Sequence, residues 1–272
     1  ILDDIKNKKN MNQIAVIGNS TAFGVGASSD KKTIASLLCK KDKTKAYNLS
    51  LRTCNSFQEL ILFQQVMSKF EKLKTIIIIS GFNDLLIDKY VERKTLLNPP
   101  VFFQNRINNI DIDSNTSILK KIIKIFSKKN SLKTRAKLEI DKNFDWKKNF
   151  SKNIKIWSSI GKEFNFNIIF ALQPYYKWSK KNFSKEEKDI FDELEKSVEK
   201  TYKVLKDFNQ DDFFKTQEFF NVTCNKNNVK FIDLNMALKE YDDTKNWLFV
   251  DALHLTDLGY KIISDKINNF LD

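Results

Sequence analysis

Residues 13–26 read QIAVIGNSTAFGVG, and this stretch decides the fold. It opens with a short apolar run over residues 13–17 and changes at once to small and polar residues around Ser20. A continuous apolar run of this length predicts a strand buried on both faces, as in a parallel sheet covered by helices. The residues that follow predict a strand-to-helix turn that contains Ser20.

The same apolar pattern returns four times along the chain, with helical patterns between the runs. Further strands are predicted at residues 46–49, 75–80, 167–172 and 229–234. Helices are predicted at residues 33–39, 57–70, 146–164, 185–208, 211–225 and 257–271. This alternation predicts an α/β fold: a three-layer α/β/α sandwich around a doubly wound, five-stranded parallel sheet of the flavodoxin-like kind. In such sheets the functional residues gather at the carboxyl ends of the strands.

The length of 272 residues fits one large domain, so we predict a single domain over residues 1–272. Two stretches, residues 85–145 and 175–225, are longer than simple connections and are predicted to be helical cap insertions. The first contains NPPVFFQN at residues 98–105, whose prolines break a helix and whose adjacent aromatic residues need packing partners. We therefore expect this stretch to cover the functional edge of the sheet.

The formal net charge of +13 raises the question of nucleic-acid binding, but the type of basic residue argues against it. Most of the positive residues are lysines spread along the chain, and arginine occurs only at positions 52, 93, 106 and 135. Because nucleic-acid surfaces favour arginine for bidentate contacts, we expect no nucleic-acid partner.

The sequence also suggests neither a disulfide nor a metal site. Cys39, Cys54 and Cys224 are odd in number and widely separated, which argues against a disulfide framework and a zinc site. The stretch DIDSNT from Asp111 begins like a calcium loop, but Thr116 replaces the glycine that such a loop requires. We therefore expect no metal.

No apolar run is long enough to span a membrane, and residues 1–10 lack the apolar core of a signal peptide. We therefore expect no membrane span in this sequence. The location stays open: the cytoplasm is preferred, and the cell envelope is the alternative if a targeting segment precedes Ile1.

His254 is the only histidine of the chain, so any acid–base chemistry by histidine must use it. It lies in FVDALHLTDLGY, residues 249–260, three residues after Asp251 and just before a final helix that Thr256 can cap. A carboxylate at this spacing can hold the imidazole in one tautomer and stabilise the imidazolium. The alternative is a surface histidine beside a helix start, and an isolated pair of this kind favours that alternative.

Two further motifs end predicted strands at the same edge of the sheet. Ser20 follows the first strand, where its hydroxyl can act as a nucleophile and the next helix N-terminus can steady negative charge. Asn83 follows the third strand in SGFNDL, residues 80–85, where its amide can donate to an oxyanion. The alternative is helix capping, by Ser20 at the first site and by Asn83 or Asp84 at the second. Together with the sole histidine, the two motifs favour catalysis.

These motifs, in the order GNS near the start, GFND after the third strand and DALH near the end, resemble those of the SGNH/GDSL hydrolases. The resemblance implies a three-layer α/β sandwich, the same fold that the strand and helix patterns predict. It also implies a nucleophile at Ser20, an acid and a base at Asp251 and His254, and an oxyanion hole formed by Asn83 and the backbone N–H of Ser20. Neither a metal nor an organic cofactor is implied.

The chain departs from the family pattern at two places. Asn19 stands where the family has an aspartate that is not a triad member, which predicts a local change of hydrogen bonds with little loss of chemistry. The second block reads NLSLRTCNSFQEL, residues 48–60, where the family offers a glycine N–H to the oxyanion hole. We align that glycine with Arg52, with Thr53 and Ser50 as alternatives. Arg52 could then face the substrate and pair with an anionic group.

These residues predict a serine esterase that cleaves a short O-acyl ester, for example an O-acetyl group on a glycan, through a covalent acyl-enzyme. The expected partner is therefore a small-molecule or glycan ester. One alternative is an O-acyltransferase that uses the same triad on a carbohydrate, and another is a non-catalytic glycan-binding domain. Phe102, Phe103, Tyr175, Tyr176 and Trp178 could form a wall that contacts sugar or acyl groups, although packing explains them equally well.

Overall fold

The structure is a computed structural model. It describes residues 11–39, 43–90, 145–197, 205–206, 208, 210–241 and 244–271. Most of the predicted cap at 85–145, with Phe102, Phe103 and the stretch from Asp111, therefore lies outside the described residues. None of the helices in the described part of the chain is both long and apolar enough to cross a membrane.

Five parallel strands form one sheet in the order β2-β1-β3-β4-β5. Their bounds are β1 Asn12–Gly18, β2 Thr44–Asn48, β3 Leu73–Ser80, β4 Asn167–Leu172 and β5 Lys230–Asp233. The predicted doubly wound, five-stranded parallel sheet is confirmed. Since β2 lies on one side of β1 and the later strands on the other, the winding reverses between β1 and β3. The carboxyl ends of these two strands flank the crevice where ligands bind in such sheets.

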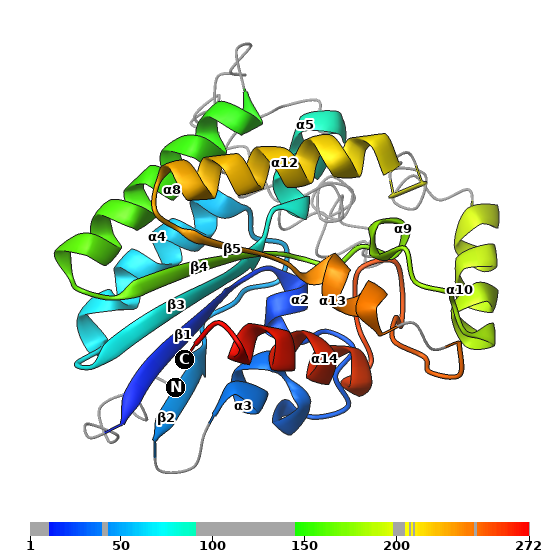
Figure 1. The fold of residues 1–272 in the computed structure, drawn as a ribbon, viewed down its shortest axis with the longest axis horizontal. Coiled ribbons are helices and arrows are strands. Elements are labelled where there is room, and N and C mark those ends of the chain that lie inside the picture. The colour runs from blue at the N-terminus through cyan, green and yellow to red at the C-terminus, as the bar shows by residue number, and fades with distance from the viewer. Residues whose placement is uncertain are drawn as a thin grey trace, which may run out of the picture.

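Helices cover both faces of the sheet, as Figure 1 shows. One layer contains α4 Ser56–Val66, α8 Trp146–Glu163 and α12 Gln210–Lys226, and the other contains α3 Ile34–Leu38, α13 Leu234–Glu240 and α14 Asp257–Asn268. The remaining α-helices of the described residues are α2 Ser20–Phe23, α5 Phe82–Tyr90, α9 Tyr176–Ser179 and α10 Lys185–Lys196. Short 3-10 turns occur at Asp30–Lys32 and Met67–Lys69. The predicted three-layer sandwich is therefore confirmed.

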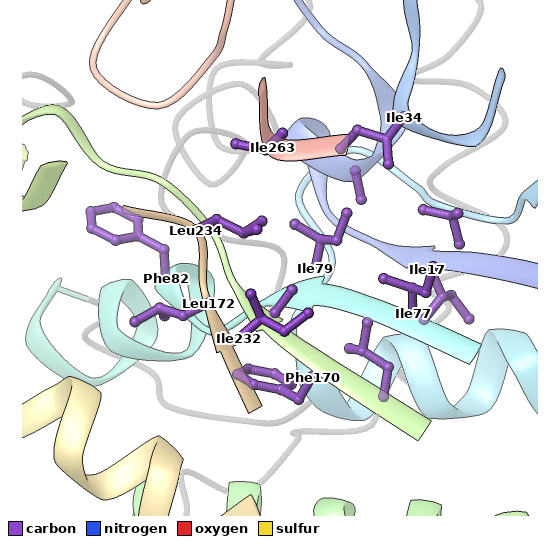
Figure 2. Close-up of a cluster of buried hydrophobic side chains, with 14 of the residues drawn as sticks. Ile17, Ile34, Ile77, Ile79, Phe82, Phe170, Leu172, Ile232, Leu234 and Ile263 are labelled. Atoms are coloured by element: carbon purple, nitrogen blue, oxygen red, sulfur yellow. The ribbon is translucent and has the colours of Figure 1, made fainter. Parts of the chain in front are cut away.

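The centre of the sheet is apolar on both faces. Residues 76–79 of β3 are four consecutive isoleucines, all of them buried, and alternate side chains of a strand point to opposite faces. Figure 2 shows Ile17 and Ile79 of the strands in one cluster with Ile34 of α3 and Ile263 of α14. Burying a side chain of this size contributes about 1.5–3 kcal/mol, so this core fixes the strand ends that carry the site.

Capping residues define where several helices begin. Asn55 and Gln58 form a capping box at the start of α4. Thr256 caps α14, as predicted, by accepting the N–H of Gly259. The N-cap of the final helix therefore lies two residues after His254, which fixes the chain on one side of that residue.

Two helices end earlier than the sequence pattern predicts. The pattern over residues 57–70 becomes α4 up to Val66, followed by the 3-10 turn. The prediction of one helix over residues 185–208 was wrong, because α10 ends at Lys196 and Ser197 has an extended backbone. Farther along, α12 packs on β5 and α8 and so belongs to a layer of the sandwich.

Tyr175, Tyr176 and Trp178 are core residues, which favours packing over the aromatic wall. Their exposed fractions are 0%, 4% and 0%. The Phe82 ring centroid lies 4.9 Å from that of Tyr175 and 5.4 Å from that of Trp178. The Tyr175 hydroxyl donates to the carbonyl of Leu205. These rings hold the segment after β4 against α5.

Candidate active site

Ser20 is the first residue of α2 and follows the end of β1 almost directly. Asn19, and not Ser20, caps this helix, because the Asn19 side-chain oxygen accepts the N–H of Thr21 at 3.1 Å. Gly18 has a φ of 151°, and a Cβ there would lie only 2.1 Å from the Ile79 carbonyl oxygen, so glycine is required at the turn. This turn leaves the Ser20 hydroxyl free of a capping role.

The structure brings Ser20, His254 and Asp251 together, although Ser20 and His254 are 234 positions apart. The His254 Nε2 atom lies 2.8 Å from Ser20 Oγ, and its Nδ1 atom lies 2.7 Å from Asp251 Oδ2. The His254 side chain is 16% exposed, which disfavours the interpretation as a surface histidine. With its proton on Nδ1, the imidazole donates to Asp251 and can accept the Ser20 proton at Nε2.

Asp251 is held by the backbone of its own turn. Its Oδ1 atom accepts the N–H groups of Leu253 and His254, each at 2.8 Å. Partial burial by itself would raise the pKa of Asp251, but the hydrogen bond and charge of the His254 ring, with these N–H groups, outweigh it and lower the pKa. The carboxylate is therefore ionised and oriented toward the imidazole.

A short antiparallel hairpin carries Asp251 and His254. Phe249 pairs with Leu255 across it, and the N–H of Val250 donates to the His254 carbonyl at 2.9 Å. The hairpin packs closely on the chain after α2, because a Cβ on Gly26 would lie 2.5 Å from the Leu255 carbonyl oxygen. This close approach brings the two ends of the chain together at the site.

Asn83 lies in the first turn of α5, next to the end of β3, and is buried. Its Nδ2 atom donates to the Cys54 carbonyl at 2.7 Å, which ties α5 to the loop between β2 and α4. The described hydrogen bond of this amide is thus to Cys54 and not to Ser20. The nitrogen carries a second hydrogen, which such an amide can offer to a ligand.

The loop between β2 and α4 runs beside the Ser20 turn, because the N–H of Leu51 donates to the Gly18 carbonyl at 3.1 Å. Arg52 is exposed, and Ser50 is buried. Thr53 has a φ of 71°, in the left-handed region that glycine adopts most readily. This conformation favours Thr53, an alternative to Arg52, as the family's glycine position, and the assignment stays a prediction.

Comparisons with known proteins place the fold. No family model matches the sequence, and no curated protein matches it. Among solved structures, the acetyl xylan esterase AlAXEase matches with a TM-score of 0.53 and 10% identity over 96% of this chain and 100% of that one. A protein of the lipolytic G-D-S-L family from Desulfitobacterium hafniense matches with a TM-score of 0.53 and 12% identity over 95% and 98% of the two chains. A two-domain esterase active on acetylated mannans has a TM-score of 0.51 and 12% identity, over 100% of this chain and 51% of that one.

The chain has the SGNH/GDSL hydrolase fold. At these identities the likeness concerns the fold, so the roles of individual residues depend on the geometry of this site. In the SGNH fold of this chain, Ser20 follows β1 and Asn83 follows β3, on the two sides of the point where the winding reverses.

Gln173 is a site residue that the sequence interpretation missed. It follows β4 directly, is buried, and accepts a hydrogen bond from the Asn19 side chain through Oε1. Its Nε2 atom donates to Thr21 Oγ1 at 3.4 Å, and that hydroxyl donates to the Leu253 carbonyl at 3.3 Å. Asn19, which stands where the SGNH pattern has an aspartate, is therefore paired with a second neutral amide. The available signal was a polar residue directly after a buried strand.

The cysteines are free thiols, and two of them are buried within this SGNH fold. Burial, with a smaller contribution from the Glu59 carboxylate, raises the pKa of Cys54 to about 12. Burial likewise raises the pKa of Cys224. Thiols with raised pKa values are poor nucleophiles near neutral pH. Within the described ranges, no group of three or more His, Cys, Asp or Glu side chains is arranged to hold a metal ion.

Proposed function

We propose that the protein is a serine esterase that removes a short acyl group from an oxygen ester. The observation that carries the proposal is the continuous hydrogen-bonded chain from Asp251 through His254 to Ser20. His254 accepts the Ser20 proton as Ser20 Oγ attacks the ester carbonyl, and Asp251 stabilises the imidazolium that forms. The imidazolium then protonates the departing alcohol, which leaves the acyl group on Ser20. His254 next deprotonates a water molecule, whose oxygen attacks the acyl carbon. The bond from that carbon to Ser20 Oγ then breaks, which releases the acid, and the imidazolium returns its proton to Ser20 Oγ.

The oxyanion of each tetrahedral intermediate needs N–H donors. In this proposal they are the backbone N–H of Ser20, the Nδ2 group of Asn83 and the backbone N–H of Thr53. Two hydrogen bonds support this set of three donors. The bond from Asn83 to Cys54 holds Asn83 next to Thr53, and the bond from Leu51 to Gly18 holds the loop of Thr53 beside the turn of Ser20. Loss of one such donor typically lowers kcat by about 100- to 1000-fold.

The substrate class that we propose is an O-acetyl or similarly short O-acyl ester on a glycan. Support comes from two proteins of the same fold, described as an acetyl xylan esterase and as an esterase active on acetylated mannans. Acetate release from acetylated xylan and acetylated mannan tests this class, with a long-chain lipid ester as the contrasting substrate. Preferential hydrolysis of the lipid ester would contradict the glycan substrate and leave the esterase proposal standing.

The chemistry itself is tested with para-nitrophenyl acetate and a fluorophosphonate probe. Ser20→Ala and His254→Ala should each lower kcat by on the order of a thousandfold or more, because the triad residues act as one unit. Peptide mapping should place the probe on Ser20. Ser159→Ala, at an exposed serine of α8, is the matched control and should retain activity. Labelling at another residue, or hydrolysis that survives both triad substitutions, would refute the proposal, and sugar acceptors added to the same assay would reveal acyl transfer.

A further inference from the structure

We propose that Glu187 is a positioning residue that holds the hairpin carrying Asp251 and His254 in its catalytic place. The inference rests on the proposed function, because it assigns Glu187 to the same site. Glu187 lies in the first turn of α10, within the segment between β4 and β5. Figure 1 shows the chain between α13 and α14 running past this end of α10.

The Glu187 carboxylate is fully buried and accepts four hydrogen bonds. Its Oε1 atom accepts the backbone N–H groups of Leu248 at 2.9 Å and Phe249 at 3.0 Å. Its Oε2 atom accepts the N–H of Ser184 at 2.8 Å and a hydrogen of the Lys181 ammonium group. A capping box requires only the bond to Ser184. The two bonds from Oε1 therefore serve the distant chain at Leu248 and Phe249.

These two residues begin the hairpin. The Leu248 carbonyl accepts the N–H of Thr256 at 2.8 Å, and Phe249 pairs with Leu255. His254 starts the returning strand and Asp251 lies in the turn. Displacement of Leu248 and Phe249 therefore moves the imidazole relative to Ser20, which is held separately by β1 and α2.

Charge also distinguishes this contact from ordinary packing. The side chains of Lys181 and Glu187 both have 0% exposure. Removing two charges from water is costly, and apolar side chains of similar volume often stabilise a protein at least as well as such a pair. A carboxylate oxygen that accepts two consecutive N–H groups instead fixes the direction of the chain. The arrangement thus serves geometry more than stability.

The test uses Glu187→Gln. The Gln oxygen is drawn to the Lys181 ammonium group, which turns its NH2 group toward the N–H groups of Leu248 and Phe249. Two sets of donors then face one another and the hairpin loses its anchor. The double variant Lys181→Met, Glu187→Gln frees the Gln oxygen to face the hairpin again. Glu193→Gln, at an exposed position of the same helix, is the matched control.

His254 supplies a readout that needs no substrate, because it is the sole histidine of the chain. Labelling with 15N-histidine makes the proton between His254 Nδ1 and Asp251 observable by NMR without ambiguity. We expect Glu187→Gln to shift or broaden this resonance, and the double variant and Glu193→Gln to keep it near the wild-type position. We also expect Glu187→Gln to slow fluorophosphonate labelling of Ser20 and lower kcat by about ten- to a hundredfold, with KM nearly unchanged.

A merely structural role would lower the melting temperature and leave the resonance and kcat of the folded fraction at the wild-type values. That result would overturn the proposal, as would a double variant as impaired as the single one. If Glu187→Gln does not fold, the double variant tests the proposal by itself. A His254 resonance and a Ser20 labelling rate like those of the wild type support the proposal. A double variant that lacks the resonance or the wild-type labelling rate overturns it. A wild-type protein that neither reacts with the probe nor hydrolyses esters refutes the proposed function, while the NMR comparison still decides the role of Glu187.

Discussion

The backbone of Thr53 is strained in a way that a substitution can relieve. Its φ of 71° lies in the left-handed region, which costs a residue with a Cβ about 1–2 kcal/mol. Thr53→Gly removes this strain, while the greater freedom of glycine in the unfolded chain offsets about 0.5–1 kcal/mol of the gain. We expect the free energy of unfolding in urea to rise by up to about 1 kcal/mol. Ester hydrolysis should persist, because the N–H of residue 53 remains.

Arg52→Gly is the matched comparison, one residue away and exposed. It relieves no left-handed strain, so it should lower the free energy of unfolding by about 0.5–1 kcal/mol. If Arg52→Gly instead raised the free energy of unfolding and Thr53→Gly lowered it, Arg52 would be favoured as the family's glycine position.

Gln173 joins the end of β4 to the Ser20 turn through Asn19 and Thr21, so its replacement should lower the stability of the fold. Gln173→Leu leaves the Asn19 amide without its acceptor in a buried place, which should lower the free energy of unfolding by about 1–3 kcal/mol. The double variant Asn19→Ala, Gln173→Leu should lose less free energy of unfolding than the sum of the losses in the two single variants, since the two residues are in contact. Urea denaturation of the single and double variants measures these losses. Gln64→Leu, at an exposed position of α4, should stay near the wild-type value, and strict additivity at Asn19 and Gln173 would contradict the pairing.

At the scale of elements, a buried carboxyl group joins α5 to α4. Asp84 Oδ1 accepts the Ser56 hydroxyl at 2.7 Å, and its Oδ2 accepts the Ser56 N–H at 3.2 Å. Burial, opposed in part by these hydrogen bonds, raises the pKa of Asp84 to about 6. Burial and the nearby Asp84 charge also raise the pKa of Glu59. The folded protein therefore holds protons on these groups at a pH where the unfolded chain has released them.

A raised carboxyl pKa makes the folded state less stable as the pH rises from the unfolded value toward the folded one. For Asp84 this predicts a loss of up to about 3 kcal/mol in the free energy of unfolding between about pH 4 and pH 7. Urea denaturation at both pH values measures it. Asp84→Asn should flatten this dependence, whereas Glu163→Gln, at an exposed site, should not. An unchanged slope in Asp84→Asn would contradict the assignment.

The strands could be predicted from sequence because each is a continuous apolar run, such as TIIIIS at β3, with a small or polar residue after it. The helices α2, α9 and α13 have four, four and seven residues, too few for a 3.6-residue period to show. The break after Lys196 was also missed, because the residues around it remain compatible with a helix. Local pattern thus predicts long elements and fails at short ones.

The candidate site also contains residues that could be predicted from the sequence and residues that could not. Ser20, His254 and Asp251 could be proposed because their residue types and strand-end positions are visible in the sequence. The conformation of Thr53 could not, since no side chain encodes a φ of 71°. Glu187 was missed because a glutamate in a charged helix resembles a solvated residue, and its partners lie 61 and 62 positions away.

At the scale of the whole molecule, the site is built from the two ends of the chain, which pack into one core. The buried apolar residues form a cluster that extends from Ile14 in β1 to Ile267 in α14. A single domain over residues 1–272 remains our prediction, and one core of this extent favours a single cooperative unfolding transition. Tryptophan fluorescence and fluorophosphonate labelling of Ser20 should therefore show the same urea midpoint.

The two probes report on different parts of that core. Trp247 adjoins the hairpin, so the fluorescence is measured with Trp247 replaced by Phe in every variant. It then reports on Trp146 and Trp157 of α8 and Trp178 of α9, which are buried outside the hairpin, whereas labelling needs the hairpin of His254 docked on the turn of Ser20. If the hairpin opened alone, labelling would fail at lower urea than the fluorescence change, since local openings cost less than global unfolding. Coincident midpoints in the wild type, together with separated midpoints in Glu187→Gln, would show that the buried carboxylate couples the hairpin to the rest of the fold. Separated midpoints already in the wild type would contradict the single cooperative unit.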